Sequence, residues 1–318
     1  MRIVFCGTPE FAVPALRQLL AEPALTVEAV VTQPDRPRGR GQQVRSSPVK
    51  DLAIASGLYV YQPEKIKSDS AYEFFKRLAP DAVVIIAYGQ IISQRLIEIP
   101  RFGWVNLHAS LLPKYRGAAP IHWAIIHGET RTGLTTMRID AGLDSGPILL
   151  QAESEIGPNE TAPEVARRLA EAGAPLVVES LRGLERGEIK PRPQDHAQAT
   201  FAPMLKKEHG KIDWSLAASQ IYNRIRGLDP WPGAFTSFRG KQCQIWGRPA
   251  PASGGLAREK TPPGTLLQHR DELYVACGEE TALHLEALRL EGRKRLPAVE
   301  FARGARRKPG ERFGAKES

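Results

Sequence analysis

The chain has 318 residues and a mass of 35.0 kDa, and 42% of its residues are hydrophobic while 25% are charged. This composition excludes a disordered or fibrous chain, and the length predicts two domains. The longest apolar run, AVVIIAY at residues 82–88, is far shorter than the roughly 18 residues that a membrane span needs, and MRIVFCGTPEF at the amino terminus lacks the apolar run of a signal peptide. We therefore expect a cytoplasmic protein without a membrane partner.

The positive charge is concentrated in the last third of the chain. Residues 1–205 contain 23 Lys and Arg against 22 Asp and Glu, whereas residues 206–318 contain 21 against 13, which is +8 of the net charge of +9. Such an excess suits a solvated surface and equally suits a binding surface for a polyanion such as nucleic acid. Cys6, Cys243 and Cys277 are too far apart in sequence for a zinc motif or a disulfide framework, so we expect no metal.

Strands and helices alternate along the first part of the chain. The apolar patterns predict a strand at 2–7, a helix at 11–22, a strand at 26–33, a helix at 49–57, an extended segment at 58–63, a helix at 69–79, strands at 81–89 and 103–108, and a helix at 119–128. This alternation predicts an α/β, Rossmann-like domain with a parallel sheet between helices. Proline, glycine and arginine in PDRPRGRGQQVRSSP, residues 34–48, predict irregular structure there.

The second part of the chain closes this domain and begins another. Residues 132–139 and 146–156 predict two strands joined by DAGLDSG, and 161–188 predict a long helix. The polar, proline-bearing segment 189–203 is typical of a linker. A helix at 215–228 is then followed by short extended pieces between glycines and prolines, which favour a small β-barrel or sandwich. We place a catalytic domain at 1–189, a linker at 190–205 and a second domain at 206–318.

Asn106 and His108 are the first candidates for a functional site. Residues two apart in a strand point to the same face, and ligands of open parallel sheets bind beyond the carboxyl ends of strands, where His108 lies. An amide and an imidazole can donate hydrogen bonds to an oxygen that gains charge during attack on a carbonyl, which indicates acyl chemistry. A carboxylate should accompany the histidine, and spacing alone does not choose between Asp140 and Asp144 in the DAGLDSG loop.

The attacking group should come from the substrate, and an amine is the natural choice. No Ser, Cys or Lys near Asn106 has the surroundings of an activated nucleophile, since Ser110 lacks the G-x-S-x-G turn. FCGTPEF after the first strand offers one glycine, so neither a dinucleotide fingerprint nor a phosphate loop is present.

Two stretches, NLHASLLPKYRGAAPIHWAI and DAGLDSGPIL, resemble the folate-dependent formyltransferases, whose signature combines Asn-x-His, Ser-Leu-Leu-Pro-x-Tyr-Arg-Gly and a downstream Asp. The resemblance implies that Asn106, His108 and Asp144 are the catalytic trio and that 10-formyltetrahydrofolate donates the formyl group. It also implies folate contacts, mostly through the main chain, at Ser110, Leu111, Leu112, Pro113, Ile86, Tyr88, Gly89, Gln90, Asp140 and Leu143.

Further segments, including TQPDRPRGRGQ, KIDWS, IRGLDPWPGAF and ARRKPGERFG, are similar to the methionyl-tRNA formyltransferases. This resemblance implies an initiator methionyl-tRNA as acceptor and a barrel-like, OB-like carboxyl-terminal domain that binds the tRNA backbone. It implies that the arginine-rich loop wedges into the acceptor end of the tRNA through Arg36, Arg38, Arg40 and Arg45. We expect a monomer.

Two other interpretations account for part of these features. Formylation of a small amine, such as an amino sugar nucleotide or glycinamide ribonucleotide, would explain the trio but leaves the arginine-rich loop and the basic domain without a role. A non-catalytic RNA-binding protein would explain the charge but not the intact trio. Without the resemblance, the loop itself would be read as a solvated flexible segment.

Overall fold

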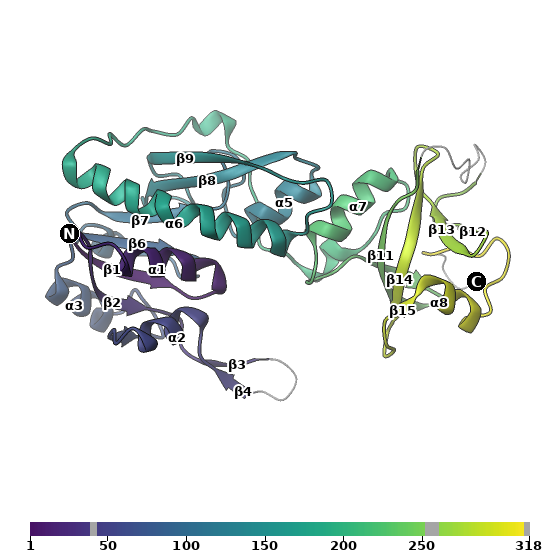
Figure 1. Cartoon of the computed structure of the whole chain (residues 1–318), viewed down its shortest axis with the longest axis horizontal. Coiled ribbons are helices and arrows are strands. Elements are labelled where there is room, and N and C mark those ends of the chain that lie inside the picture. Colours follow the sequence, from purple (N-terminus) through teal and green to yellow (C-terminus); the bar gives the residue numbers. More distant parts are fainter. Residues whose placement is uncertain (39–42, 252–260, 315–318) are drawn as a thin grey trace. The chain divides into compact units, whose positions relative to one another are not determined.

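A computed structural model of the chain describes residues 1–38, 43–251 and 261–314 (Figure 1). The chain divides into two compact units. Unit 1 contains residues 1–120, 131–155 and 164–203, and unit 2 contains residues 121–130, 156–163 and 204–318. Two short segments from earlier in the chain, 121–130 and 156–163, therefore pack with the carboxyl-terminal part. Among the described residues, no helix is long and apolar enough to cross a membrane.

Unit 1 is built on a seven-stranded sheet with the strand order β5-β2-β1-β6-β7-β8-β9. Its elements are β1 (Arg2–Gly7), α1 (Val13–Leu20), β2 (Thr26–Val31), β3 (Arg36–Arg38), β4 (Gln43–Arg45), α2 (Pro48–Ala55), β5 (Val60–Tyr61), α3 (Asp69–Leu78), β6 (Ala82–Ile86), α4 (Gln94–Ile97), β7 (Trp104–His108), β8 (Arg131–Arg138), β9 (Ile148–Glu155) and most of α6 (Ala162–Arg186).

One strand of this sheet, β8, runs opposite to the others. The five strands from β5 to β7 are parallel, as the sequence predicts, whereas β8 and β9 are antiparallel to their neighbours. The segment between β8 and β9 spans only residues 139–147, which is too short for the crossover that a parallel pair needs. The predicted α/β domain is confirmed, but its sheet is mixed and mostly parallel instead of parallel throughout.

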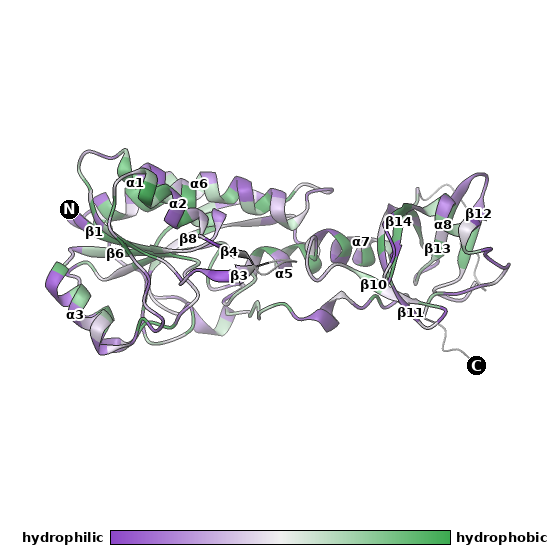
Figure 2. Cartoon of the chain, turned by 90° about the horizontal axis from the view of Figure 1, so that it is seen from below, coloured by the Kyte–Doolittle hydropathy of each residue, from purple (hydrophilic) through white to green (hydrophobic). Residues whose placement is uncertain are grey.

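Alternation along the strands sends apolar side chains to both faces of the sheet. On one face, Val4 and Cys6 of β1 pack in a core cluster with Phe75 of α3 and Trp104 of β7. Ile3 and Phe5, which alternate with them, are buried on the other face. Figure 2 shows β1 and β6 in the green of hydrophobic residues and α6 with hydrophobic and hydrophilic stretches. The near-continuous apolar strands are thus explained by burial on both faces.

Helices α2 and α3 begin where serine side chains cap them. The Ser47 hydroxyl accepts a hydrogen bond from the backbone N–H of Lys50, and the Ser68 hydroxyl accepts one from Ala71. These bonds satisfy N–H groups that the first turn of a helix leaves without partners.

The arginine-rich segment is more regular than its composition predicts. Strands β3 and β4 form a short antiparallel pair in which Arg36 lies opposite Arg45 and Pro37 opposite Val44. The expectation of irregular structure over 34–48 is therefore wrong for these two strands. A proline is tolerated because, among the described strands, none other pairs with β3 or β4, so the missing N–H breaks no ladder of a larger sheet.

Unit 2 contains an antiparallel sheet with the order β10-β11-β14-β13-β12, and β15 pairs with β14. Its elements are α5 (Pro120–Ile126), α7 (Ala218–Gly227), β10 (Phe235–Phe238), β11 (Lys241–Pro249), β12 (Leu266–His269), β13 (Glu272–Ala276), β14 (Ala282–Leu290), β15 (Leu296–Pro297) and α8 (Ala298–Gly304). Ile221 of α7, Ile245 of β11, Leu285 of β14 and Phe301 of α8 share one buried core. The second region thus forms an antiparallel sheet packed against helices.

Helix α8 departs from the sequence prediction, which places only extended pieces after residue 229. The helix has seven residues, and only Ala298 and Phe301 are buried. A helix of two turns that buries two side chains gives too short a periodic pattern to be recognised.

Most of the predicted linker, residues 190–203, belongs to unit 1 and packs closely against the rest of it. Arg192 pairs with Ile148 of β9 through two backbone hydrogen bonds of 2.8 Å, and Phe201 forms a β-bridge with Arg116. Between these points Gln194 is buried. We call residues 190–203 the strap, because near both ends its backbone is bonded to other segments of unit 1.

Candidate active site

Strand β7 presents Asn106 and His108 on the face that also carries Trp104. Trp104 is fully buried, and its indole N–H donates to the carbonyl of Leu96 at 2.8 Å. Leu107 points to the opposite face, where it lies against Gly173 of α6. The strand is therefore anchored on both faces, and this anchoring fixes the directions of Asn106 and His108.

The imidazole of His108 is held by two groups. Its Nε2 lies 2.9 Å from the carbonyl oxygen of Tyr115, which can only accept, so Nε2 carries a proton. Its Nδ1 lies 3.7 Å from Oδ2 of Asp144, within ion-pair range. The ring is 6% exposed, so both contacts act with little competition from water. Nδ1 is thus the ring nitrogen able to gain or lose a proton beside a carboxylate.

The structure separates the two candidate aspartates. The carboxylate of Asp140 accepts hydrogen bonds from the backbone N–H of Gly142 at 3.0 Å and the hydroxyl of Ser145 at 2.8 Å, so it closes a turn within its own loop. The carboxylate of Asp144 accepts one from the backbone N–H of Gly117 at 2.8 Å and faces His108. Asp144 has a φ of 46°, in the left-handed region that non-glycine residues seldom occupy.

The loop of residues 139–147 reaches His108 by folding back along β7. The N–H of Ile139 donates to the carbonyl of Trp104, at the amino end of β7, whereas His108 is the last residue of that strand. The loop therefore starts at one end of the strand and brings Asp144 to the other. A loop that follows a strand parallel to β7 would start at the carboxyl end of β7. Because β8 runs in the opposite direction, its loop starts at the amino end of β7, and the position of Asp144 follows from this reversal.

The carboxamide of Asn106 differs from the neighbouring polar groups in its hydrogen bonding. Within the described part of the chain, no residue forms a hydrogen bond with this carboxamide. The side chain is half-buried, so its amide is accessible from one side. A half-buried amide with N–H groups that the described residues leave unbound is suited to binding a ligand oxygen.

In the segment 110–113, the side chains of Ser110 and Leu112 point inward. The Ser110 hydroxyl donates to the carbonyl of Lys114 at 2.6 Å, and Leu112 packs against Met137 and Ile148. Leu111 and Pro113 are half-buried. A ligand at this segment would meet Leu111, Pro113 and the main chain rather than the Ser110 hydroxyl.

The other residues that the resemblance links to folate also offer mainly backbone. Ile86 and Tyr88 are buried, and burial raises the pKa of the Tyr88 phenol. Gly89 has a φ of +89°, and Gln90 uses its side-chain amide to bind the backbone of Ile66 and Glu64. Leu143 is 60% exposed, so it alone of these side chains is largely open to solvent.

The four predicted RNA-binding arginines lie on or between β3 and β4. Arg36 and Arg45 are exposed on these strands, and Arg36 lies 3.8 Å from Glu64 as a weak ion pair. Arg38 ends β3, and Arg40 lies outside the described residues. At the base of this hairpin, Lys50 forms an ion pair and hydrogen bond with Asp35.

The sequence interpretation missed a buried hydrogen-bond network behind Asp144. The Gln194 amide donates to the carbonyls of Asp144 at 2.9 Å and Gly146 at 2.7 Å, and its oxygen accepts from Arg116. Arg116 stands in the quoted Tyr-Arg-Gly motif, which could have drawn attention to it. Gln194 lies in a polar segment that carries no signal of this role.

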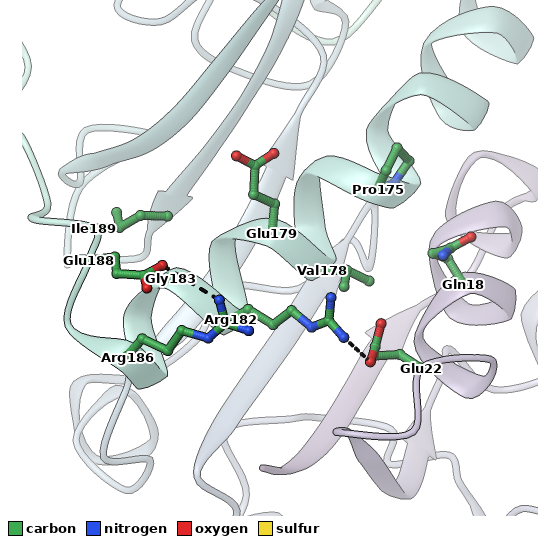
Figure 3. A pocket seen from close by; sticks show the side chains of 10 residues that line it. All are labelled: Gln18, Glu22, Pro175, Val178, Glu179, Arg182, Gly183, Arg186, Glu188 and Ile189. Atoms are coloured by element: carbon green, nitrogen blue, oxygen red, sulfur yellow. Dashed lines mark hydrogen bonds and ion pairs between the residues drawn. The ribbon is translucent and has the colours of Figure 1, made fainter.

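A cavity of about 590 Å³ lies elsewhere in unit 1, between α1 and α6 (Figure 3). Arg182 of α6 pairs there with Glu22 after α1, and Arg186 lies 3.8 Å from Glu188. None of Asn106, His108 and Asp144 lines this cavity. We place the candidate site at β7 instead, because the polar groups that converge there suit a reaction.

Comparison with known proteins identifies the family of this chain. Residues 1–181 match the formyl transferase family, and residues 204–306 match the formyl transferase carboxyl-terminal domain. Methionyl-tRNA formyltransferase of Solibacter usitatus is 54% identical over 99% of each chain, and that of Acidobacterium capsulatum is 52% identical over 99% of this chain and 100% of its own. The chain belongs to the methionyl-tRNA formyltransferase family. It is thus a formyltransferase, as its sequence predicts.

Solved structures share the fold of this family at lower identity. An N-formyltransferase from Helicobacter canadensis, in complex with folinic acid and dTDP-3-aminofucose, is 18% identical with a TM-score of 0.63, over 89% of this chain and 98% of its own. HypX from Aquifex aeolicus in complex with tetrahydrofolic acid gives a TM-score of 0.63 at 18% identity, over 100% of this chain and 51% of its own. These similarities support the fold alone.

Proposed function

We propose that this chain transfers a formyl group from 10-formyltetrahydrofolate to the α-amino group of methionine on initiator methionyl-tRNA. The observation that carries the proposal is the cluster at β7. Asn106 offers an amide that forms no hydrogen bond with the described residues, and His108 stands beside it with Asp144 at its Nδ1. The cluster belongs to a chain that is 54% identical to a methionyl-tRNA formyltransferase.

The chemistry requires stabilisation of one oxygen and transfer of one proton. As the amine attacks the formyl carbon, the formyl oxygen gains negative charge, and the N–H groups of Asn106 donate to it. The new C–N bond forms at the amine, the bond between the formyl carbon and N10 breaks, and a proton leaves the amine for N10. His108 carries this proton at Nδ1, because its Nε2–H is held by Tyr115. Asp144 stabilises the ring while it is protonated.

This assignment differs in one respect from the sequence interpretation. That interpretation uses Asn106 and His108 together as donors to the oxygen. Because the Nε2–H of His108 already donates to a backbone carbonyl, we assign oxygen binding to Asn106 and proton transfer to His108.

The residues predicted to contact folate fit a planar apolar ring with a polar edge. Backbone groups of residues 86–90 and 140–143 would supply donors and acceptors to the folate, and Leu143 offers an exposed apolar side chain. Ile91, which follows Gln90 directly, is 89% exposed. Apolar side chains that are open to solvent, next to a few polar groups, suit a ligand site.

We further infer that tRNA binds through the β3–β4 hairpin and through the basic residues of the second region. In this proposal residues 1–189 are the catalytic domain, 190–205 the linker and 206–318 the tRNA-binding domain. The antiparallel sheet of that region would curl into the barrel-like, OB-like form, since a register shift at Trp246 and Gly247 increases its local twist. Cytoplasmic location and a monomeric state belong to the same proposal.

A comparison of acceptors tests the function. Purified protein should formylate charged initiator tRNA in preference to charged elongator tRNA and to small amines, and its tRNA affinity should fall steeply as salt rises, because binding phosphates releases counterions. Transfer to an amino sugar nucleotide or to glycinamide ribonucleotide at a higher kcat/KM than to tRNA would replace the proposal with the small-amine interpretation.

The arginine-rich loop gives a separate expected result. Changing Arg40 to Ala should raise the KM for tRNA by about tenfold or more, because a hydrogen bond to a charged group contributes about 1.5–3 kcal/mol. The slow reaction with a minimal aminoacyl acceptor should keep its rate. The matched control is Arg131→Ala, which removes the same charge from an exposed position on β8. Equal damage to both reactions by Arg40→Ala would indicate a structural role.

A further inference from the structure

The backbone of the loop that carries Asp144 is held by one amide from the strap. Nε2 of Gln194 donates to the carbonyl oxygen of Asp144 at 2.9 Å and to that of Gly146 at 2.7 Å. Both N–H bonds of this amide are thus used on the same loop. Gln194 is 6% exposed, so water competes little for these carbonyls.

Arg116 determines which way the Gln194 amide points. Its Nε and Nη2 donate to Oε1 of Gln194 at 3.1 Å and 2.7 Å. A guanidinium has no acceptor, so the amide must turn its oxygen toward Arg116 and its NH₂ toward the loop. The hydrogen bonds from Arg116 therefore determine which end of the Gln194 amide is oxygen and which is nitrogen, two atoms that are otherwise hard to tell apart.

Arg116 is itself buried without a carboxylate. It is 6% exposed, and none of the described carboxylates lies within ion-pair distance of its guanidinium. Nη2 also lies 3.0 Å from Nδ1 of His196 in the strap. A buried cation without a counter-ion is costly, and its hydrogen bonds to neutral acceptors are charge-assisted and therefore stronger than ordinary ones.

Asp144 needs such support because of its backbone conformation. Its φ of 46° costs a non-glycine residue free energy that the surrounding structure has to offset. The two bonds from Gln194, and the bond from the Gly117 N–H to the Asp144 carboxylate, restrain the backbone and the side chain of this residue. Gly117 follows Arg116 directly, so the same turn supplies both restraints.

We propose that Gln194 and Arg116 are positioning residues that hold Asp144 at His108. The proposal rests on the proposed function, in which Asp144 stabilises the protonated ring. A shift of about 1 Å in a group that acts on the reaction can cost up to about 100-fold in rate. Loss of the Gln194 amide should therefore reduce turnover. This amide bonds to the loop and to Arg116, so it acts on the reaction through the position of Asp144.

The test is a double-mutant cycle with Gln194→Met and Asp144→Ala. Methionine keeps the length of the side chain and removes the amide. We expect kcat to fall between about 10- and 100-fold in Gln194→Met, with the KM for folate and tRNA nearly unchanged. In the Asp144→Ala background, the same substitution should change kcat by no more than about twofold, because the residue that it positions is gone.

Two further variants separate positioning from folding. Gln194→Glu keeps acceptors for Arg116 but places a carboxylate against the two loop carbonyls, so it should retain the thermal stability and lose kcat as Gln194→Met does. Gln198→Met, at an exposed position of the same strap, should leave kcat and stability unchanged.

The possible outcomes are distinguishable. Equal losses of kcat from Gln194→Met in both backgrounds, or normal kcat in Gln194→Met or Gln194→Glu while Asp144→Ala is impaired, would overturn the positioning role and leave the proposed function intact. Near-normal formyl transfer by Asp144→Ala would overturn the catalytic role of Asp144 and with it the positioning role, whereas absence of formyl transfer by the unsubstituted protein would overturn the proposed function.

Discussion

Changing His108 to Ala should lower kcat by about 10²–10⁴-fold, the usual contribution of a positioned acid-base group. The substitution removes the ring nitrogen that faces Asp144, so the proton of the attacking amine loses its acceptor. Water does not replace it easily, because the ring is 6% exposed. Steady-state kinetics with saturating folate and charged tRNA would measure the effect.

Two controls make this result specific. Thermal unfolding should show that the variant is folded, since the side chain ends a strand that Trp104 and Leu107 anchor. His269→Ala, at an exposed position of β12, should keep the normal kcat. A kcat within a few-fold of normal in a folded His108→Ala protein would exclude proton transfer through this ring.

Changing Asn106 to Ala should lower kcat by about 10²–10³-fold, as the loss of one donor to a developing oxyanion does. The KM for tRNA should change little, because the donor acts on charge that appears only in the transition state. Since no described residue binds the Asn106 carboxamide, its removal breaks no hydrogen bond within the described protein. We therefore expect the free energy of unfolding to stay nearly constant.

The variant Asn106→Asp tests whether the amide of Asn106 acts as a donor. It keeps the size of the side chain and exchanges the amide N–H groups for a carboxylate oxygen, which repels negative charge. Its kcat should be as low as that of Asn106→Ala or lower. An active Asn106→Asp enzyme would mean that the amide does not donate to the formyl oxygen, and the assignment of Asn106 would have to be abandoned.

Much of unit 1 could be predicted because its signals are local. Residues 2–7 form β1 as expected, since a short apolar run between polar residues has few other conformations that bury it. Period-two alternation likewise predicts that Asn106 and His108 share a face of β7. Both features depend on residues that are close in sequence, and sequence patterns report such local structure.

The rest of the site depends on contacts between distant segments. Spacing could not choose between Asp140 and Asp144, because the choice depends on how residues 139–147 fold back along β7. Gln194 lies 86 positions after His108 in a segment whose composition is that of a linker. Its burial depends on Arg116 and on the loop carbonyls, which no local pattern describes. The missed helix α8 is a smaller case, since two buried side chains leave no clear periodicity.

The attachment of the strap to unit 1 determines where the catalytic half of the protein can be cut. The match to the formyl transferase family stops at residue 181, and α6 stops at Arg186. A fragment truncated at either point would contain Asn106, His108 and Asp144 and yet lack Gln194. The guanidinium of Arg116 would then be left in the interior with its main acceptor deleted. An excised catalytic half should therefore extend through Pro203, the last strap residue.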